Sequence, residues 1–277
     1  MAKPLLRYPG GKARLASRIV DIAQQSIVDR GVKVGRYIEP FVGGGAVFFA
    51  MDEAGLAPSS IIADKNPDLI RLYRHVCDEP DRLIEVFDSW PQTEANYYHI
   101  RDVAYIGFGD AELAARELWL NRLCFNGLYR KNRKGRFNVA WGKFKRHRPI
   151  NEENLYTVSA ALRRATILHA DFRDVIRQAG AGDIIYVDPP YAVGKKRAFV
   201  NYTGRFEWSD HVDLVAELVA AVGRGAIVIS SNSWLDETIE LYTNSEFTVE
   251  QVHMARSINC KGGGRKKVPE LLAWRTA

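Results

Sequence analysis

Cysteine is scarce in this chain: only three occur among 277 residues, and they lie far apart in the sequence. Cys77, Cys124 and Cys260 show neither the spacing of a metal or redox site nor the density of a disulfide-rich secreted domain. The six histidines also lack the spacing of metal ligands. We therefore expect no bound metal, and the cysteine usage is typical of a reducing cytosol.

Long apolar runs are missing as well, and none approaches the ~18 residues that a membrane-spanning helix needs. The N-terminal segment MAKPLLRYPGGK is basic but has no apolar core of a secretory signal. We therefore expect a cytoplasmic protein without a membrane partner. The composition is globular, with 47% hydrophobic residues, and the length suffices for one large domain or two modest ones.

Acidic residues are absent from residues 121–150, a segment that contains ten lysines and arginines. The whole chain has a net charge of only +6, so the rest of it is net negative. Positive charge concentrated on a mildly acidic body is typical of a docking site for a polyanion. A solvated basic surface without a partner is the less favoured alternative.

Strand and helix patterns alternate near both ends of the chain, which predicts an α/β fold with a parallel, doubly wound sheet. A helix is expected to end at Gly31, and another to begin at Ser209 as its N-cap. Between these regions, residues 66–163 read as helical and then basic, and we interpret them as an inserted subdomain. The strand candidates are residues 36–41, 59–64, 165–171, 183–188, 225–231, 247–254 and 270–275.

One strand candidate, IIYV, ends abruptly in Asp188, Pro189, Pro190 and Tyr191. Proline lacks an N–H group and cannot continue a strand ladder, so Asp188 is expected where the strand leaves the sheet. Ligands bind at this edge in open α/β sheets. An aspartate before an ordinary Pro-Pro turn is the alternative on these residues alone.

A second motif, YIEPFVGGGAVFF, has the form of a strand, a glycine-rich turn and a helix. Glycines 43–45 would let a nucleotide approach the backbone closely. Asp64, at the end of the next strand candidate, could accept hydrogen bonds from both hydroxyls of a ribose. No GxxxxGK[ST] loop is present, which argues against an ATP cradle. A tight turn followed by an N-capping Asp64 is the structural alternative.

Together these motifs resemble the Dam-type (D12 class) DNA adenine-N6 methyltransferases along nearly the whole chain. The matching segments, in family order, are RYPGGK, EPFVGGG, IIADKNPDLI, LNRLCFNGLYRKNRKGRFNVAWG, YVDPPY and RSINCKGGGRKKVPELLAW. The resemblance implies a Rossmann-like S-adenosylmethionine-dependent methyltransferase domain formed by residues 1–65 and 164–277. It also implies that residues 66–163 are a helical target-recognition subdomain with a basic hairpin, and that the target adenine is flipped out of duplex DNA.

The resemblance also assigns roles to single residues. Cofactor-site positions are matched by Tyr8, Lys12, Phe41, Gly43, Asp64, Asp171, Phe172 and Asp188. Leu128 and Arg130 match positions that read a thymine and the outer guanine of GATC, and DNA contacts are further matched by Arg7, Phe125 and Asn126. Contacts to phosphate are expected from Arg133, Lys134, Lys143, Lys145 and Arg146. The sequence departs from the family at Tyr8, which is often Trp, and at Ala140, which is often Pro.

The chemistry of adenine methylation suits these residue types. The exocyclic N6 is a poor nucleophile because its lone pair is delocalised into the ring, and positive charge builds on it during transfer. The two N–H groups of this amino group could donate hydrogen bonds to the Asp188 carboxylate and the Pro189 carbonyl. The Tyr191 ring could stack on the flipped base. We therefore assign catalysis to Asp188, Pro189 and Tyr191 and expect direct transfer without a covalent intermediate.

Other functions stay open at this point. An amino-methyltransferase acting on RNA adenine or on N4 of DNA cytosine would use the same core, although Asp at position 188 favours adenine. A catalytically silent DNA-binding relative would keep the basic hairpin. We expect a bacterial or phage-encoded monomer whose partner is double-stranded DNA, and a cognate restriction endonuclease is a further candidate partner.

Overall fold

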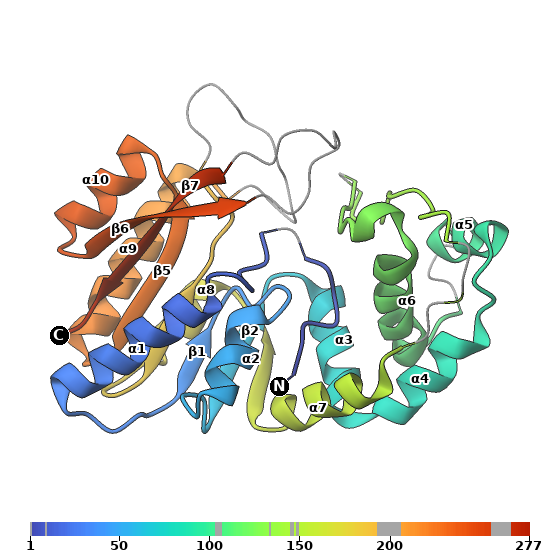
Figure 1. Ribbon diagram of the computed structural model, residues 1–277, viewed down its shortest axis with the longest axis horizontal. Coiled ribbons are helices and arrows are strands. Elements are labelled where there is room, and N and C mark those ends of the chain that lie inside the picture. Colours follow the sequence, from blue (N-terminus) through green and yellow to red (C-terminus); the bar gives the residue numbers. More distant parts are fainter. Residues whose placement is uncertain are drawn as a thin grey trace.

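A seven-stranded sheet forms the centre of the computed structural model, which describes residues 2–8, 10–102, 107–132, 134–144, 147, 150–192, 206–255 and 267–277. The strand order is β3-β2-β1-β4-β5-β7-β6 (Figure 1). The strands are β1 (Tyr37–Glu39), β2 (Ser60–Asp64), β3 (Ala165–His169), β4 (Ile184–Val187), β5 (Ile227–Ser233), β6 (Thr248–Ala255) and β7 (Lys267–Arg275). The predicted α/β class and Rossmann-like sheet are confirmed.

The two C-terminal strands depart from the predicted parallel arrangement. Strands β1 to β5 are mutually parallel, whereas β7 runs antiparallel to β5 and β6 runs antiparallel to β7. Strands β6 and β7 follow one another in the chain and pair directly. Parallel neighbours need a crossover connection that is usually helical, whereas antiparallel neighbours do not.

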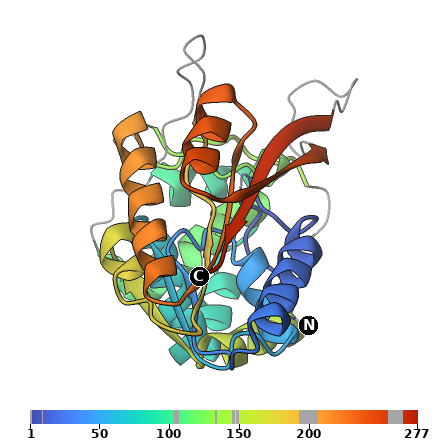
Figure 2. The ribbon, with the colours of Figure 1, turned by 90° about the vertical axis from the view of Figure 1, so that its left-hand side faces the viewer.

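Helices cover both faces of the sheet because side chains alternate between the faces along each strand. Tyr37 and Tyr186 belong to the apolar cluster on the side of α1 (Ala16–Arg30) and α2 (Ala46–Glu53). Ile38 and Val187 belong to the cluster on the other side. The helices of that side are α8 (Phe172–Ile176), α9 (Trp208–Gly223) and α10 (Asp236–Asn244). Figure 2 shows α1 and α9 on opposite sides of the strands.

Helix ends confirm one expected signal and correct another. Helix α1 ends at Gly31, which adopts the left-handed conformation with φ 59°. Helix α9 begins at Trp208, so its N-cap lies two residues before the predicted Ser209. Glu207 is the cap: its carboxylate accepts from the backbone of Asp210, whose carboxylate accepts from the Glu207 N–H. This reciprocal pair already satisfies the first turn, so a serine hydroxyl is not needed there.

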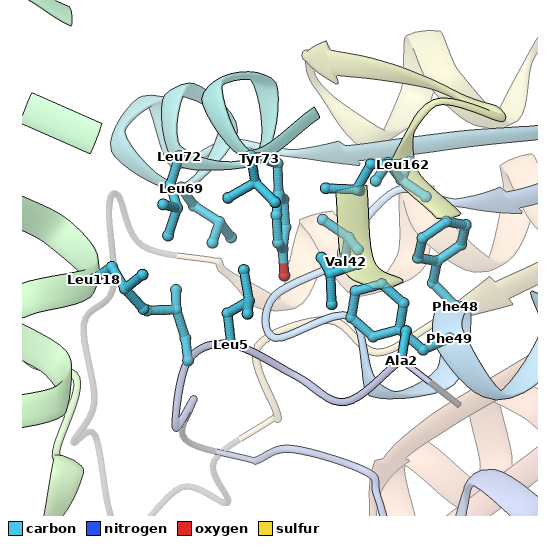
Figure 3. Packing of buried hydrophobic residues seen from close by; sticks show 14 of the residues in the cluster. Ala2, Leu5, Val42, Phe48, Phe49, Leu69, Leu72, Tyr73, Leu118 and Leu162 are labelled. Atoms are coloured by element: carbon cyan, nitrogen blue, oxygen red, sulfur yellow. The ribbon is translucent and has the colours of Figure 1, made fainter. Parts of the chain in front are cut away.

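The segment between β2 and β3 is mostly helical. Leu69, Leu72 and Tyr73 of α3 share an apolar cluster with Val42 of the turn after β1 and Phe48 of α2 (Figure 3). The predicted boundaries of a separate subdomain at 66 and 163 stay a prediction. The helices here are α3 (Pro67–Asp78), α4 (Pro80–Ser89), α5 (Glu94–Asp102), α6 (Asp110–Leu123), the 3-10 turn η1 (Phe125–Gly127) and α7 (Glu152–Leu162). No helix in the described part of the chain is both long and apolar enough to cross a membrane.

A buried carboxylate ties together the amino ends of β1 and β4. Asp183 accepts a hydrogen bond from the backbone N–H of Arg36 at 2.7 Å, and its second oxygen lies 2.7 Å from the Arg36 guanidinium. A Cβ on Gly35 would lie 2.6 Å from the same carboxylate, so only glycine permits this approach. Burial raises the pKa of Asp183, but the hydrogen bonds and charge of Arg36 outweigh it and lower the pKa on balance.

Asp183→Asn is expected to lower the free energy of unfolding by about 1–3 kcal/mol at pH 7, because the buried Asp183 loses its charge-assisted hydrogen bonds to the half-exposed Arg36. The folded-state pKa lies below the unfolded one, so this stability is present above about pH 4 and disappears as the pH falls through the folded pKa. Urea unfolding of both proteins at pH 7 and pH 3 measures the gap. A gap of equal size at both pH values would contradict the assignment, and the exposed Asp174→Asn serves as the control.

Candidate active site

The order of the strands reverses between β1 and β4, because β2 lies on one side of β1 and β4 on the other. In open α/β sheets, ligands bind at such a switch point, beyond the carboxyl ends of the strands. The chain leaves β1 through residues 40–45 and leaves β4 through residues 188–191. The glycine turn and the DPPY motif, distant in the sequence, therefore meet at one edge of the sheet.

Asp188 is held in place but keeps access to solvent. Its Oδ1 accepts a hydrogen bond from Ser231 Oγ at 2.7 Å and lies 3.1 Å from Lys12 Nζ. The hydroxyl of Tyr186 lies 2.9 Å from Ser231 Oγ, and it is the donor there, since Ser231 gives its only proton to Asp188. The Asp188 side chain is 20% exposed, whereas that of Lys12 is 5% exposed. An oriented, partly open carboxylate can accept hydrogen bonds from a ligand.

Lys12 connects Asp188 with a second carboxylate that the sequence did not single out. Its Nζ lies 3.7 Å from Glu270 Oε2 and 4.6 Å from the centre of the Tyr191 ring. The Tyr191 hydroxyl donates to the same Glu270 oxygen at 2.8 Å. Burial, followed by the charges of Asp188 and Glu270, raises the pKa of Tyr191 well above its usual value, so its hydroxyl stays protonated.

The end of β5 supports the chain just past Tyr191. Asn232 Oδ1 accepts from the Ala192 N–H at 3.3 Å, and Ser233 Oγ donates to the Ala192 carbonyl at 2.9 Å. The amide of Asn232 also lies 3.3 Å from His211 Nδ1. Burial lowers the pKa of His211 to about 4, so the ring is neutral and can accept this hydrogen bond. The sequence patterns indicate no role in the site for Ser231, which ends the strand candidate 225–231, or for Asn232.

The glycine turn rests on Asp64. Its two carboxylate oxygens accept the backbone N–H groups of Gly43 at 3.1 Å and of Asn66 at 2.9 Å. The cap of helix α3 is Asn66, so the alternative of an N-capping Asp64 is wrong. Gly43 has φ 46°, and a Cβ there would lie 3.2 Å from the ring of Tyr8. Burial raises the pKa of Asp64, and the N–H groups of Asn66 and Gly43 oppose that shift.

Two predicted aromatic positions, Phe41 and Phe172, contact a third aromatic residue, Phe206, which no motif in the sequence indicates. Their ring centres lie 5.5 Å apart, and Phe206 lies 5.8 Å from Phe41 and 5.7 Å from Phe172. Asp171 caps helix α8 through the Arg173 N–H and is also paired with the Arg173 guanidinium at 3.2 Å. Of the predicted residues, Tyr8 and Asp64 therefore contact the turn that contains Phe41 and Gly43, and Phe172 contacts Phe41.

The basic segment forms the expected hairpin. Cys124 pairs with Trp141 and Lys131 with Phe137 in antiparallel bridges. At its base, Phe125 is 48% exposed, and Asn126 is exposed with φ 54°. A Cβ on Gly127 would lie 2.2 Å from the Arg7 side chain, so Arg7 packs directly against this end of the hairpin.

The remaining predicted DNA contacts are distributed differently. Leu128 is partly buried against the apolar core. Arg130 is exposed, and its Nε donates to Asn138 Oδ1 at 2.8 Å across the hairpin. Lys134 and Lys143 are exposed. The predicted contacts Arg133, Lys145 and Arg146 lie outside the described residues.

Lys131 differs from its basic neighbours because it points inward. Its side chain is 9% exposed, and its Nζ lies 2.5 Å from Asp68 and 3.1 Å from the buried Glu117. Glu117 also accepts from the Tyr129 hydroxyl, which in turn accepts from the Asn66 amide at 2.8 Å. The ammonium of Lys131 is therefore engaged inside the protein, where it anchors the hairpin to α3 and α6.

A family model described as D12 class N6 adenine-specific DNA methyltransferase matches residues 8–258. The chain belongs to this family. The match confirms the resemblance inferred from the ordered motifs and identifies an enzyme that methylates adenine in DNA.

The similarity of this methyltransferase to its relatives extends over most of its length. A type II methyltransferase of Methanocaldococcus jannaschii is 36% identical over 279 residues and covers 95% of both chains. A DNA adenine methylase of Vibrio cholerae is 33% identical and covers 98% of this chain and 95% of its own. A DNA N-6-adenine-methyltransferase of Escherichia phage P1 is 38% identical over 86% of this chain and 32% of its own length. The likeness therefore includes the hairpin and is not confined to the catalytic motifs.

Lys131→Met in this methyltransferase is expected to lower the free energy of unfolding by about 3 kcal/mol, because Glu117 is left buried without its cation. Lys134→Met makes the same chemical change at an exposed position of the same hairpin and is expected to change stability by less than about 0.5 kcal/mol. Urea unfolding of both variants tests the difference. Equal stability of the two variants would show that the buried ion pair does not anchor the hairpin.

Proposed function

We propose that this enzyme transfers the methyl group of S-adenosylmethionine to N6 of an adenine that is flipped out of duplex DNA, within the sequence GATC. The observation that carries the proposal is the Asp188 carboxylate, which lies at the switch point, is oriented by Ser231 and stays partly exposed. Family membership supplies the adenine-N6 reaction. The cofactor, the flipped base and the recognition sequence are our inference.

The residues around the glycine turn suit S-adenosylmethionine. Each Asp64 oxygen accepts one backbone N–H, which leaves a further lone pair on each for the hydroxyls of a ribose. Phe41 and Phe172 offer ring faces for an adenine. When bound, the cofactor would supply an electrophilic methyl group on a sulfonium. Lys12 lies with Asp188 and Glu270 in this structure, and its predicted contact to the cofactor stays a prediction.

The DPPY motif would act on the amino group by electrostatics. A carboxylate at Asp188 accepts one N6–H and the Pro189 carbonyl accepts the other, which draws the nitrogen lone pair out of conjugation and stabilises the positive charge that builds on it. The fixed φ of proline aims that carbonyl. The hydrogen bond from its hydroxyl to Glu270 restricts the Tyr191 side chain, which supports the proposed stacking of its ring on the base.

The hairpin is suited to duplex DNA because it combines exposed guanidinium and ammonium groups with the exposed Phe125 ring. Arginine can bind O6 and N7 of guanine together, and an apolar side chain such as Leu128 can contact a thymine methyl. A base in a stacked duplex cannot reach the sheet edge, so flipping is part of the proposal. A monomeric state and a cognate restriction endonuclease stay predictions.

Asp188→Ala is expected to abolish methyl transfer and to leave DNA affinity within a few fold, because in this proposal the hairpin makes the duplex contacts. Tritiated-methyl transfer to defined oligonucleotides measures activity, and fluorescence anisotropy measures DNA binding. A variant that keeps a tenth of wild-type turnover at saturating cofactor would exclude Asp188 as the N6 acceptor. RNA and adenine-free G·C duplexes, tested as further substrates, separate adenine-N6 methylation of DNA from the related amino-methyltransferase reactions.

Arg130→Ala is expected to cost about 1–3 kcal/mol in binding at the cognate site and to relax discrimination at one guanine. Lys134→Ala is expected to weaken binding to all sequences equally and to flatten the salt dependence by about one unit, because only counterion release changes. Binding to GATC and to each singly substituted site, across a salt series, compares the two variants.

The reverse pattern would exchange these two roles. In that pattern Lys134→Ala changes base preference, and Arg130→Ala weakens binding to every site equally. A wild-type enzyme without preference for GATC would refute the roles of Leu128 and Arg130 in recognition. Methyl transfer through Asp188 would be unaffected by that result.

A further inference from the structure

Glu270 brings a second negative charge to the Asp188 site from a distant part of the chain. It lies on β7, opposite Ser233 of β5, and its side chain is 17% exposed. Among the described residues, its carboxylate contacts the Tyr191 hydroxyl of the DPPY motif and the Lys12 ammonium, which itself lies next to Asp188. The Lys12 ammonium is thus placed between two carboxylates, at 3.1 Å from Asp188 and 3.7 Å from Glu270.

The charge of Lys12 poses a problem for the proposed reaction. An ammonium 3.1 Å from Asp188 offsets the negative charge that is needed to stabilise the positive charge on N6. In a poorly hydrated site, charges a few ångströms apart interact strongly. The Lys12 side chain is almost fully buried, so water does little to screen it. With Glu270 ionised, the group of three side chains instead keeps one net negative charge.

We propose that Glu270 is a positioning residue for methyl transfer, acting through Lys12 and Tyr191. Its carboxylate balances the Lys12 charge, so that Asp188 acts on the amino group as an uncompensated anion. The same carboxylate fixes the Tyr191 ring through its hydroxyl. This inference rests on the proposed function of Asp188 and adds a charge requirement to it.

Glu270→Gln separates charge from shape. Glutamine keeps the size and an acceptor oxygen for the Tyr191 hydroxyl, but it removes the negative charge. We expect the single-turnover rate at saturating cofactor and DNA to fall on the order of 10- to 100-fold, below the loss typical of a group that contacts the reacting atoms. The dissociation constants of cofactor and DNA and the melting temperature are expected to stay at their wild-type values. A structural role would move those values as well.

Glu250→Gln is the matched control. Glu250 lies on the neighbouring strand β6, and its carboxylate pairs with Arg18 at 2.7 Å, at a partly exposed position. Its loss is expected to leave the single-turnover rate unchanged. A fall in rate in Glu250→Gln equal to that in Glu270→Gln would overturn the assignment of a specific role to Glu270.

A double-mutant cycle with Lys12→Gln tests the charge balance directly. Lys12→Gln in the Glu270→Gln background restores one net negative charge, so it is expected to cost less rate there than in the wild-type background. Independent, multiplicative losses would overturn the proposal, as would a wild-type rate for Glu270→Gln. A wild-type enzyme that does not methylate adenine would refute the proposed function itself, and this baseline is measured first.

Discussion

The reversal of strand order between β1 and β4 is the constraint on which the site depends. It brings two segments that are far apart in the sequence to one edge, and their alignment is set at the far edge, where Asp183 and Arg36 join the amino ends of the two strands. The pairing of Tyr37 with Ile184 follows directly from this junction. Because a shift of one residue would turn Asp188 to the other face of the sheet, the polar contact at one edge determines the chemistry at the other.

The site edge and the hairpin carry opposite charge. The carboxylates of Asp188 and Glu270 lie at this edge with Lys12 between them, and Glu39 and Asp64 are the last residues of β1 and β2. Burial raises the pKa values of Glu39 and Asp64, and each is stabilised by hydrogen-bond donors: the Tyr37 hydroxyl for Glu39 and backbone N–H groups for Asp64. An acidic edge favours a cationic small molecule, whereas the exposed lysines and arginines of the hairpin favour a polyanion. The two surfaces agree with the two substrates of the proposed reaction.

Features set by short stretches of sequence could be predicted, and those set by contacts between distant segments could not. The strands, the glycine turn and the DPPY edge each follow from local residue types, and so does the hairpin. Glu270 reaches the site only because β7 pairs antiparallel with β5, and the residues of the VPELL segment do not predict this pairing. Lys131 resembles its basic neighbours in sequence, and only Glu117 and Asp68 from two helices turn it inward. The missed residues are those whose partners lie far along the chain.

One hydrogen-bonded chain joins the hairpin to the glycine turn. The Tyr129 hydroxyl of the hairpin accepts from the Asn66 side chain, the Asn66 N–H donates to Asp64, and Asp64 accepts from Gly43. The Tyr8 ring lies 4.9 Å from the Tyr129 ring and also packs against Gly43. The stem of the hairpin and the turn are therefore fixed to the same buried residues and share one support. In the proposed reaction, DNA held by the hairpin must reach the sheet edge that contains the turn, and this shared anchor would keep the hairpin and the turn at a constant separation.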